Sequence, residues 1–155
     1  MSGPWHQWPH CRRDEEGSAL IELTWLGLLL LIPLVYVMLT LVTLQRSAYG
    51  ATEAARAAGR AYILAPELET AAGRAYEAAR LSMLDQGVVL DPADLQIVCH
   101  PDPGSCLQPG SSVEVMLALD VALPLMPSIG SDALASIAVD ASHVESYGIY
   151  REAAR

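Results

Sequence analysis

The feature that most constrains this chain is an uncharged run over residues 23–44, whose only polar side chains are three threonines, a tryptophan and a tyrosine. As an α-helix rising about 1.5 Å per residue, the run reaches about 33 Å, enough to cross a hydrocarbon core of about 30 Å. Its apolar residues are not confined to one face, as those of an amphipathic helix in a soluble protein are. The sequence therefore predicts a membrane-spanning helix over residues 18–44.

A cleaved secretory signal is the alternative interpretation of this run. The apolar core of a signal peptide is usually about 7–15 residues long, which is shorter than the run in this chain. A weak small-residue cleavage site does exist at residues 48–50. The length of the run favours an anchor that stays in the membrane.

Length and charge limit the rest of the protein. The chain has 155 residues, and about 110 of them remain outside the apolar run and its leader, which is enough for one modest domain. The net charge of −9 argues against nucleic acid as a partner, because a phosphate backbone requires clustered positive charge. No sequence feature points to a small-molecule substrate.

Three cysteines flank the run, Cys11 before it and Cys99 and Cys106 after it. Residues 101–105 form a turn-rich loop that can bring Cys99 and Cys106 together, so a disulfide is favoured on an oxidising face of the membrane. A zinc site with His100 as an additional ligand is one alternative, although it lacks a fourth good ligand nearby. Two unpaired thiols are the other.

Residues 1–17 are expected to form an irregular leader before the span. Arg12 and Arg13 favour a cytoplasmic N-terminus, whereas three arginines after the span favour the opposite orientation. The cysteine pair favours an oxidising compartment on the C-terminal side. We therefore expect a single-pass protein of the cytoplasmic membrane, with its N-terminus inside and its C-terminal domain extracytoplasmic.

An alanine-rich segment over residues 45–86 follows the span and is helical in pattern, with Pro66 dividing it. The Ala-Ala-Gly-Arg-Ala-Tyr of residues 57–62 returns at residues 71–76. On a continuous helix this offset of about four turns would place both copies on one face. Pro66 and the acidic residues after it suggest instead a break and a restart. The small residues permit close packing inside the chain's own domain and against neighbouring subunits, and the two are compatible.

Beyond residue 87 the apolar period changes from helical to two. Apolar residues alternate with others near residues 95–99, 113–121 and 137–141, which predicts half-buried strands. We expect a small antiparallel sheet within residues 87–155, with one face covered by the second helical segment. The predicted fold class is α+β: a long N-terminal transmembrane helix continuing into the alanine-rich helical segment, then this sheet.

No catalytic constellation can be assembled from the sequence. It contains no glycine-rich phosphate loop, no pair of histidines at helical spacing and no nucleophile elbow. His143 lies in a predicted strand and is expected to be satisfied or exposed, and Asp120 and Asp140 are expected on the solvent face of their strands. We therefore predict a protein that is not an enzyme and has no catalytic, cofactor or metal site.

Glu22 is the exceptional residue of the predicted span. A carboxylate at the start of a membrane helix is costly and usually marks a function or a partner. If the chain were cut between Gly17 and Ser18, the new α-ammonium of Ser18 would lie one helical turn from Glu22 on the same face. The two charges would then pair within one chain or between adjacent subunits. Alternatively, Glu22 lies at headgroup level, where the helix dipole favours a negative charge.

The order Gly-Ser-Ala-Leu-Ile-Glu at residues 17–22, followed by the apolar run, resembles the processing site of type IV pilin-like proteins. Together with Pro33 and the alanine-arginine stretch at residues 54–61, it is similar to the TadE-like family of minor pseudopilins of the tight-adherence (Flp) pilus machinery. The similarity covers residues 12–65. Beyond them only the general pilin-like arrangement agrees, a helical segment followed by a small β-rich region.

This resemblance implies cleavage after Gly17 by a membrane-embedded prepilin peptidase, with Ser18 as the mature N-terminus and Glu22 as a residue of subunit assembly. The implied partners are membrane lipid, the prepilin peptidase, other pilin-like subunits and the pilus assembly platform. The expected function is that of a minor subunit in assembly of the pilus, pilus-associated or extracellular after processing. The alternative is a single-pass envelope protein whose outer domain binds a partner without any fibre.

Overall fold

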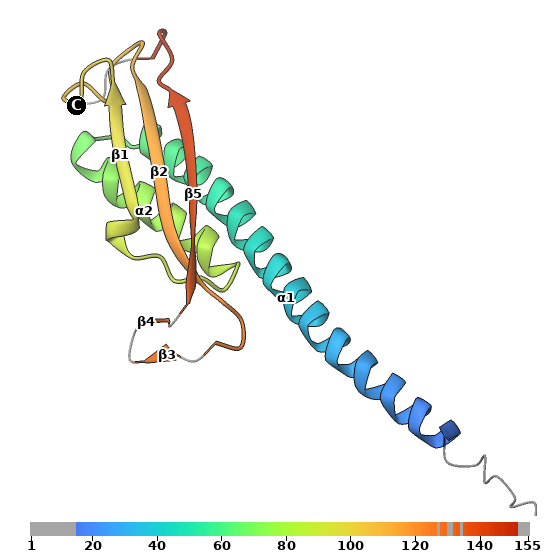
Figure 1. The fold of residues 1–155 in the computed structure, drawn as a ribbon. Helices are drawn as coiled ribbons and strands as arrows, with labels where there is room; N and C mark the ends of the chain where they lie inside the picture. Colours follow the sequence, from blue (N-terminus) through green and yellow to red (C-terminus); the bar gives the residue numbers. More distant parts are fainter. Residues whose placement is uncertain (1–14, 127, 130–131, 134, 152–155) are drawn as a thin grey trace, which may run out of the picture. The chain divides into compact units, whose positions relative to one another are not determined.

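The structure is a computed structural model that describes residues 15–126, 128–129, 132–133 and 135–151 (Figure 1). The chain divides into two compact units, residues 1–38 and 39–155. The helices and strands are α1 (Glu15–Ile63), α2 (Leu68–Leu84), the short 3₁₀ helix η1 (Pro92–Asp94), β1 (Leu95–His100), β2 (Ser112–Ala122), β3 (Ser128–Ile129), β4 (Asp132–Ala133) and β5 (Ser136–Ser146).

The described part of the first unit is the beginning of α1. Its side chains from residue 18 to residue 35 are all exposed, and Leu29 and Leu30 are each 69% exposed. The most apolar window of the helix has a mean hydropathy of 2.5, and none of that window is buried. The helix is thus long and apolar enough to cross a membrane, and its surface is the kind that lipid covers.

The alanine-rich segment forms two helices rather than one. α1 ends at Ile63 and α2 begins at Leu68, so Pro66 lies in the connection, as the break-and-restart interpretation predicted. The guanidinium of Arg151 donates a hydrogen bond to the carbonyl of Ile63 at 3.2 Å. This bond satisfies one of the carbonyls that every helix leaves without a partner at its C-terminal end, and a cation is favoured there.

The two copies of the internal repeat therefore lie on different helices, residues 57–62 on α1 and residues 71–76 on α2. The continuous helix that would have placed both copies on one face does not form, because the proline-containing connection separates them. Gly59 of the first copy is buried, whereas Gly73 of the second copy is exposed. The two copies thus share a sequence, but corresponding residues differ in how far they are buried.

A three-stranded antiparallel sheet in the order β1-β2-β5 forms the β-rich part of the second unit (Figure 1). β2 is the central strand, and its residues alternate between buried and more exposed positions along its length. Val113, Val115 and Leu117 are almost completely buried on one face. On the other face Asp120 and Asp140 are exposed, as predicted from the alternation.

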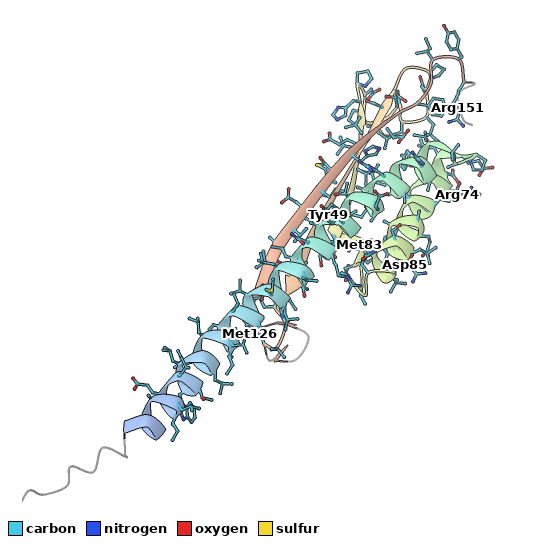
Figure 2. All side chains as sticks on the ribbon, turned by 90° about the vertical axis from the view of Figure 1, so that its right-hand side faces the viewer. Tyr49, Arg74, Met83, Asp85, Met126 and Arg151 are labelled. Carbon is cyan, nitrogen blue, oxygen red and sulfur yellow. A yellow bond between two sulfur atoms is a disulfide. The ribbon has the colours of Figure 1, made fainter. Side chains whose placement is uncertain are left out.

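The buried face of the sheet packs against helices, and side chains of both α1 and α2 belong to the core (Figure 2). The helical layer that covers the sheet therefore includes α1 as well as α2, whereas the sequence predicted that the second helical segment alone would cover it. Met83 and Leu117 are among the largest fully buried side chains, each contributing about 1.5–3 kcal/mol by leaving water. The helices supply mainly alanines to this core: Ala51, Ala54, Ala55, Ala58, Ala71, Ala75 and Ala79.

Small alanine side chains allow α1 to lie close to the sheet, and at Gly59 even a Cβ atom would make a tight contact with it. A Cβ atom placed on Gly59 would lie 3.3 Å from Cβ of Glu145 and 3.8 Å from Cγ2 of Val115. A Cβ atom on Gly73 would meet nothing within 4 Å. The backbone of α1 thus lies directly on β5 and β2 at Gly59, where no larger side chain fits without displacement.

Candidate functional site

The residues proposed for processing and assembly lie in the first two turns of α1. This helix begins at Glu15, so the bond between Gly17 and Ser18 is helical in the uncut chain. Glycine is the weakest helix former except proline, so opening the helix at Gly17 costs little. Residues 1–14, which include most of the expected leader and Cys11, lie outside the described residues.

Glu22 and Ser18 are both exposed on α1, four residues apart and therefore on one face. Within the described part of the chain, the carboxylate of Glu22 forms neither an ion pair nor a hydrogen bond with another described residue. In the uncut chain the backbone nitrogen of Ser18 belongs to an amide, which carries no charge. The geometry leaves the carboxylate available to an ammonium, whether from its own chain after cleavage or from another chain.

A disulfide joins Cys99 at the end of β1 to Cys106 in the β1–β2 loop, with Cα atoms 5.1 Å apart. The bond uses both thiolates that the zinc alternative required. His100 points to a different partner, since its Nε2 lies 3.1 Å from the Glu114 carboxylate across the β1–β2 ladder. Closing so short a loop typically stabilises a domain by about 2–3 kcal/mol.

The disulfide also connects the sheet to the end of α1. Cys99 is 3% exposed, and the hydroxyl of Tyr62 lies 4.0 Å from its Sγ. Burial raises the pKa of the Tyr62 phenol, because the charged form would lose its hydration. Tyr62 therefore stays neutral and packs as an apolar group with a polar tip, joining α1 to β1.

No arrangement of the described residues indicates catalysis. The Nε2 of His143 lies 3.0 Å from the Glu145 carboxylate on the same strand, so this histidine has a partner, as expected. Within the described ranges, no group of three or more histidine, cysteine, aspartate and glutamate residues could hold a metal ion. The carboxylate of Asp102 has a lowered pKa because it accepts hydrogen bonds from the Gly104 N–H and the Ser105 hydroxyl, which shape the loop.

The alanine stripe of α1 is used inside the chain's own domain. Ala54 and Ala58 are fully buried in the core, so the stripe packs inside the chain's own domain. The opposite face of the helix is exposed and charged, with an ion pair of 3.1 Å between Arg56 and Glu53. A partner of α1 at Glu53 and Arg56 would contact that charged face.

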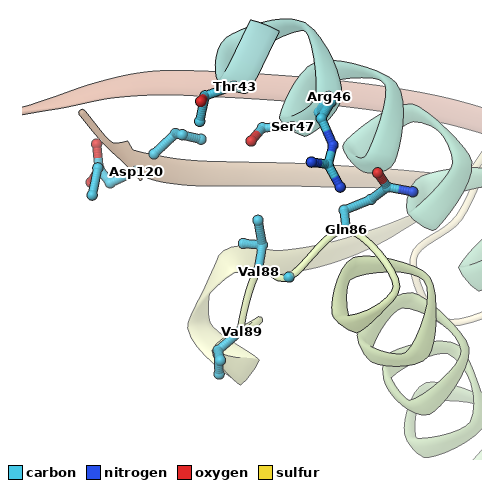
Figure 3. Close-up of a pocket in the computed structure, with 10 residues that line it drawn as sticks. Thr43, Arg46, Ser47, Gln86, Val88, Val89 and Asp120 are labelled. Atoms are coloured by element: carbon cyan, nitrogen blue, oxygen red, sulfur yellow. The ribbon is translucent and has the colours of Figure 1, made fainter. Parts of the chain in front are cut away.

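Sequence reasoning missed a pocket of about 390 Å³ in the second unit, between α1, the loop after α2 and the end of β2 (Figure 3). Arg46 and Ser47 border it from α1, and Gln86 and Val88 border it from the loop. No local pattern could have found it, because these residues are distant in sequence. The one available signal is an arginine that follows the apolar run closely.

No protein-family model, characterised protein or solved structure matches this chain. The similarity to TadE-like pseudopilins therefore rests on residues 12–65 of the sequence, and it stays a prediction.

Proposed function

We propose that this protein is a minor pilin-like subunit that takes part in assembly of a tight-adherence pilus and is not an enzyme. The observation that carries the proposal is the start of α1, where an exposed carboxylate lies one turn after a Gly-Ser pair in an otherwise lipid-like helix surface. A carboxylate is costly in that setting unless it has a partner. Cleavage at the Gly-Ser pair would create one.

In this proposal, a prepilin peptidase cuts after Gly17 and leaves the α-ammonium of Ser18 at the start of the helix. The ammonium pairs with Glu22, most usefully with the Glu22 of a subunit already in the bundle. Apolar side chains gain little by leaving lipid for the apolar side chains of a neighbouring helix. A charge pair in that environment therefore specifies the register of an incoming helix, while apolar packing does not.

The rest of the chain supplies an outer domain that the helix carries to the assembly. The disulfide and the alanine core support a domain that is stable in an oxidising compartment, consistent with an extracytoplasmic position. Other pilus components would contact two exposed surfaces. One is the charged face of α1 around Arg56, and the other is the face of α2 that carries an ion pair. Membrane lipid covers the first half of α1 before assembly.

The alternative is a single-pass envelope protein that binds a partner through its outer domain and enters no fibre. An anchor of that kind needs neither a cut at Gly17 nor a carboxylate in its helix. The small sheet and the disulfide suit both functions equally. The beginning of α1 is therefore where the two hypotheses differ.

Shearing of surface fibres from intact cells tests the proposal. We expect the processed chain in the sheared fraction of a strain with a working pilus system, in small amounts relative to the major pilin. Deleting the assembly ATPase should return all of the chain to the membrane fraction, while the total amount stays the same. A chain found only in the membrane in both strains would favour the envelope-protein alternative.

A further inference from the structure

Three polar side chains with hydrogen-bond donors converge on the pocket beside α1: the Arg46 guanidinium, the Ser47 hydroxyl and the Gln86 amide (Figure 3). None of the three forms a hydrogen bond or ion pair with another described residue. Ser47 is only 3% exposed, but its oxygen is not one of the sealed polar atoms of the described residues and borders the pocket. A hydroxyl, an amide and a guanidinium that border one pocket together offer several donors to a ligand with acceptor oxygens.

Ser47 differs in this respect from other hydroxyl residues of the same helix. Thr43 donates to the carbonyl of Leu39 at 2.9 Å, and Thr52 donates to the carbonyl of Ala48 at 3.0 Å. Such bonds to the preceding turn are the usual way for a helical hydroxyl to be satisfied. Ser47 forms no such bond, and in Figure 3 its oxygen points toward the pocket.

The backbone around the pocket is shaped to bring Gln86 next to Arg46. Gly50 lies one turn beyond Arg46 on α1, and a Cβ atom there would come within 2.7 Å of Cγ of Gln86. Gly87 has φ of +77°, a conformation that favours glycine and turns the chain away after Gln86. The missing side chain at position 50 thus makes room for the amide beside the guanidinium.

The pocket lies at the end of the domain that belongs next to a membrane surface. Arg46 follows Leu44, the last residue of the apolar run, by two positions. A small cavity beside it is lined by Thr40 and Leu44 of α1 together with the end of β2. At the same end the loop after β2 exposes Leu125 by 82% and Met126 by 47%, apolar side chains suited to a lipid interface (Figure 2).

We propose that this pocket binds the phosphodiester group of a membrane phospholipid. The Arg46 guanidinium and the Ser47 hydroxyl donate hydrogen bonds to the phosphate oxygens, and the Gln86 amide donates a further one. Val88 and Val121 border the same pocket and lie against the apolar part of the lipid. The inference rests on the proposed function only in that it requires α1 to be in a membrane.

A lipid phosphate suits this site better than soluble phosphate for two reasons. About half of the pocket's border is apolar, as the upper part of an acyl chain requires, and the exposed loop beside it is apolar as well. Asp120 also borders the pocket, but it belongs to the exposed alternation of β2 and lies at the end away from Arg46 (Figure 3). It therefore leaves the donor end free for an anion.

Native mass spectrometry of the full-length chain in detergent, titrated with phosphatidylethanolamine or phosphatidylglycerol, tests this proposal. We expect one tightly bound phospholipid per chain. Arg46→Gln should weaken binding about tenfold or more, since a charge-assisted bond is lost. Ser47→Ala should weaken it severalfold without lowering thermal stability, because alanine favours the helix and no described residue loses a hydrogen bond. Arg60→Gln, at an exposed arginine away from the pocket, should bind as the unchanged protein does.

Three results would overturn the site. One is unchanged lipid binding by Ser47→Ala, since a purely electrostatic attraction of Arg46 to the membrane surface does not depend on a neutral hydroxyl. Another is equal loss of lipid from Arg46→Gln and Arg60→Gln. The third is competition by millimolar inorganic phosphate, which would identify a soluble anion as the ligand. Carbonate extraction of cell membranes reports separately on whether α1 is inserted, so a failed lipid site and a failed membrane assignment are told apart.

Discussion

Glu22→Ala should insert into the membrane normally and yet reach surface fibres at a level at least tenfold below that of the unchanged chain. Insertion depends on the apolar length of α1, which the substitution increases. In the proposed assembly the carboxylate is the partner of an incoming Ser18 ammonium, which without it would be a buried, uncompensated charge. Leaving one member of a buried pair alone typically costs about 3–5 kcal/mol.

The matched control for this substitution is Glu53→Ala on the same helix. Glu53 is exposed and, among the described residues, pairs with Arg56 three residues later, an interaction that contributes little to stability. Its removal should leave the fibre fraction unchanged. Glu22→Gln is the sharper variant, because it keeps the shape and removes only the charge. Normal fibre levels for Glu22→Gln would show that the charge has no part in assembly and that Glu22 merely lies at the headgroup level.

Gly59→Leu should lower the free energy of unfolding of the outer domain by about 2–3 kcal/mol. The new side chain would collide with side-chain atoms of β5 and β2 that lie close to the backbone, and it would force α1 away from the sheet. The reason is the 3.3 Å contact that a Cβ atom alone would already make with Glu145. For a domain of this size the midpoint of thermal unfolding should fall by roughly 10 °C. Circular dichroism of the full-length chain in detergent measures this midpoint.

Gly73→Leu is the control that the internal repeat provides. Gly73 has the same neighbours in sequence as Gly59, but a Cβ atom there meets nothing within 4 Å. Leucine is a better helix former than glycine by nearly 1 kcal/mol, so Gly73→Leu should leave the midpoint unchanged or raise it slightly. If the two variants lost similar stability, α1 would not contact the sheet at Gly59 in the way described.

Local patterns in the sequence were sufficient to predict the α+β layout. The length of the apolar run predicted a helix that could cross a membrane, and the alternation in residues 113–121 predicted the central strand that is now β2. Pro66 predicted the break between the helices, since proline removes a donor and disfavours a helix before it. The turn-rich loop between Cys99 and Cys106 predicted their disulfide.

What the sequence could not provide are the pairings between distant segments. The repeat predicts equivalent positions for Gly59 and Gly73, and only the packing of α1 on β5 makes one of them essential. The pocket brings Arg46 and Gln86 together through the antiparallel return of α2, which no spacing encodes. The role of Glu22 depends on an amine that exists only after a covalent change, so it stays a proposal from the residues around it.

Cleavage after Gly17 can be read from the N-terminus of the protein isolated from cells with an active or an inactivated prepilin peptidase. Intact-mass and N-terminal peptide spectrometry read it without any assumption about fibres. We expect a chain that begins at Ser18 when the peptidase is active and retains residues 1–17 when it is not. A chain that retains the leader in both strains, while other pilins of the same cells are cut, would contradict this expectation.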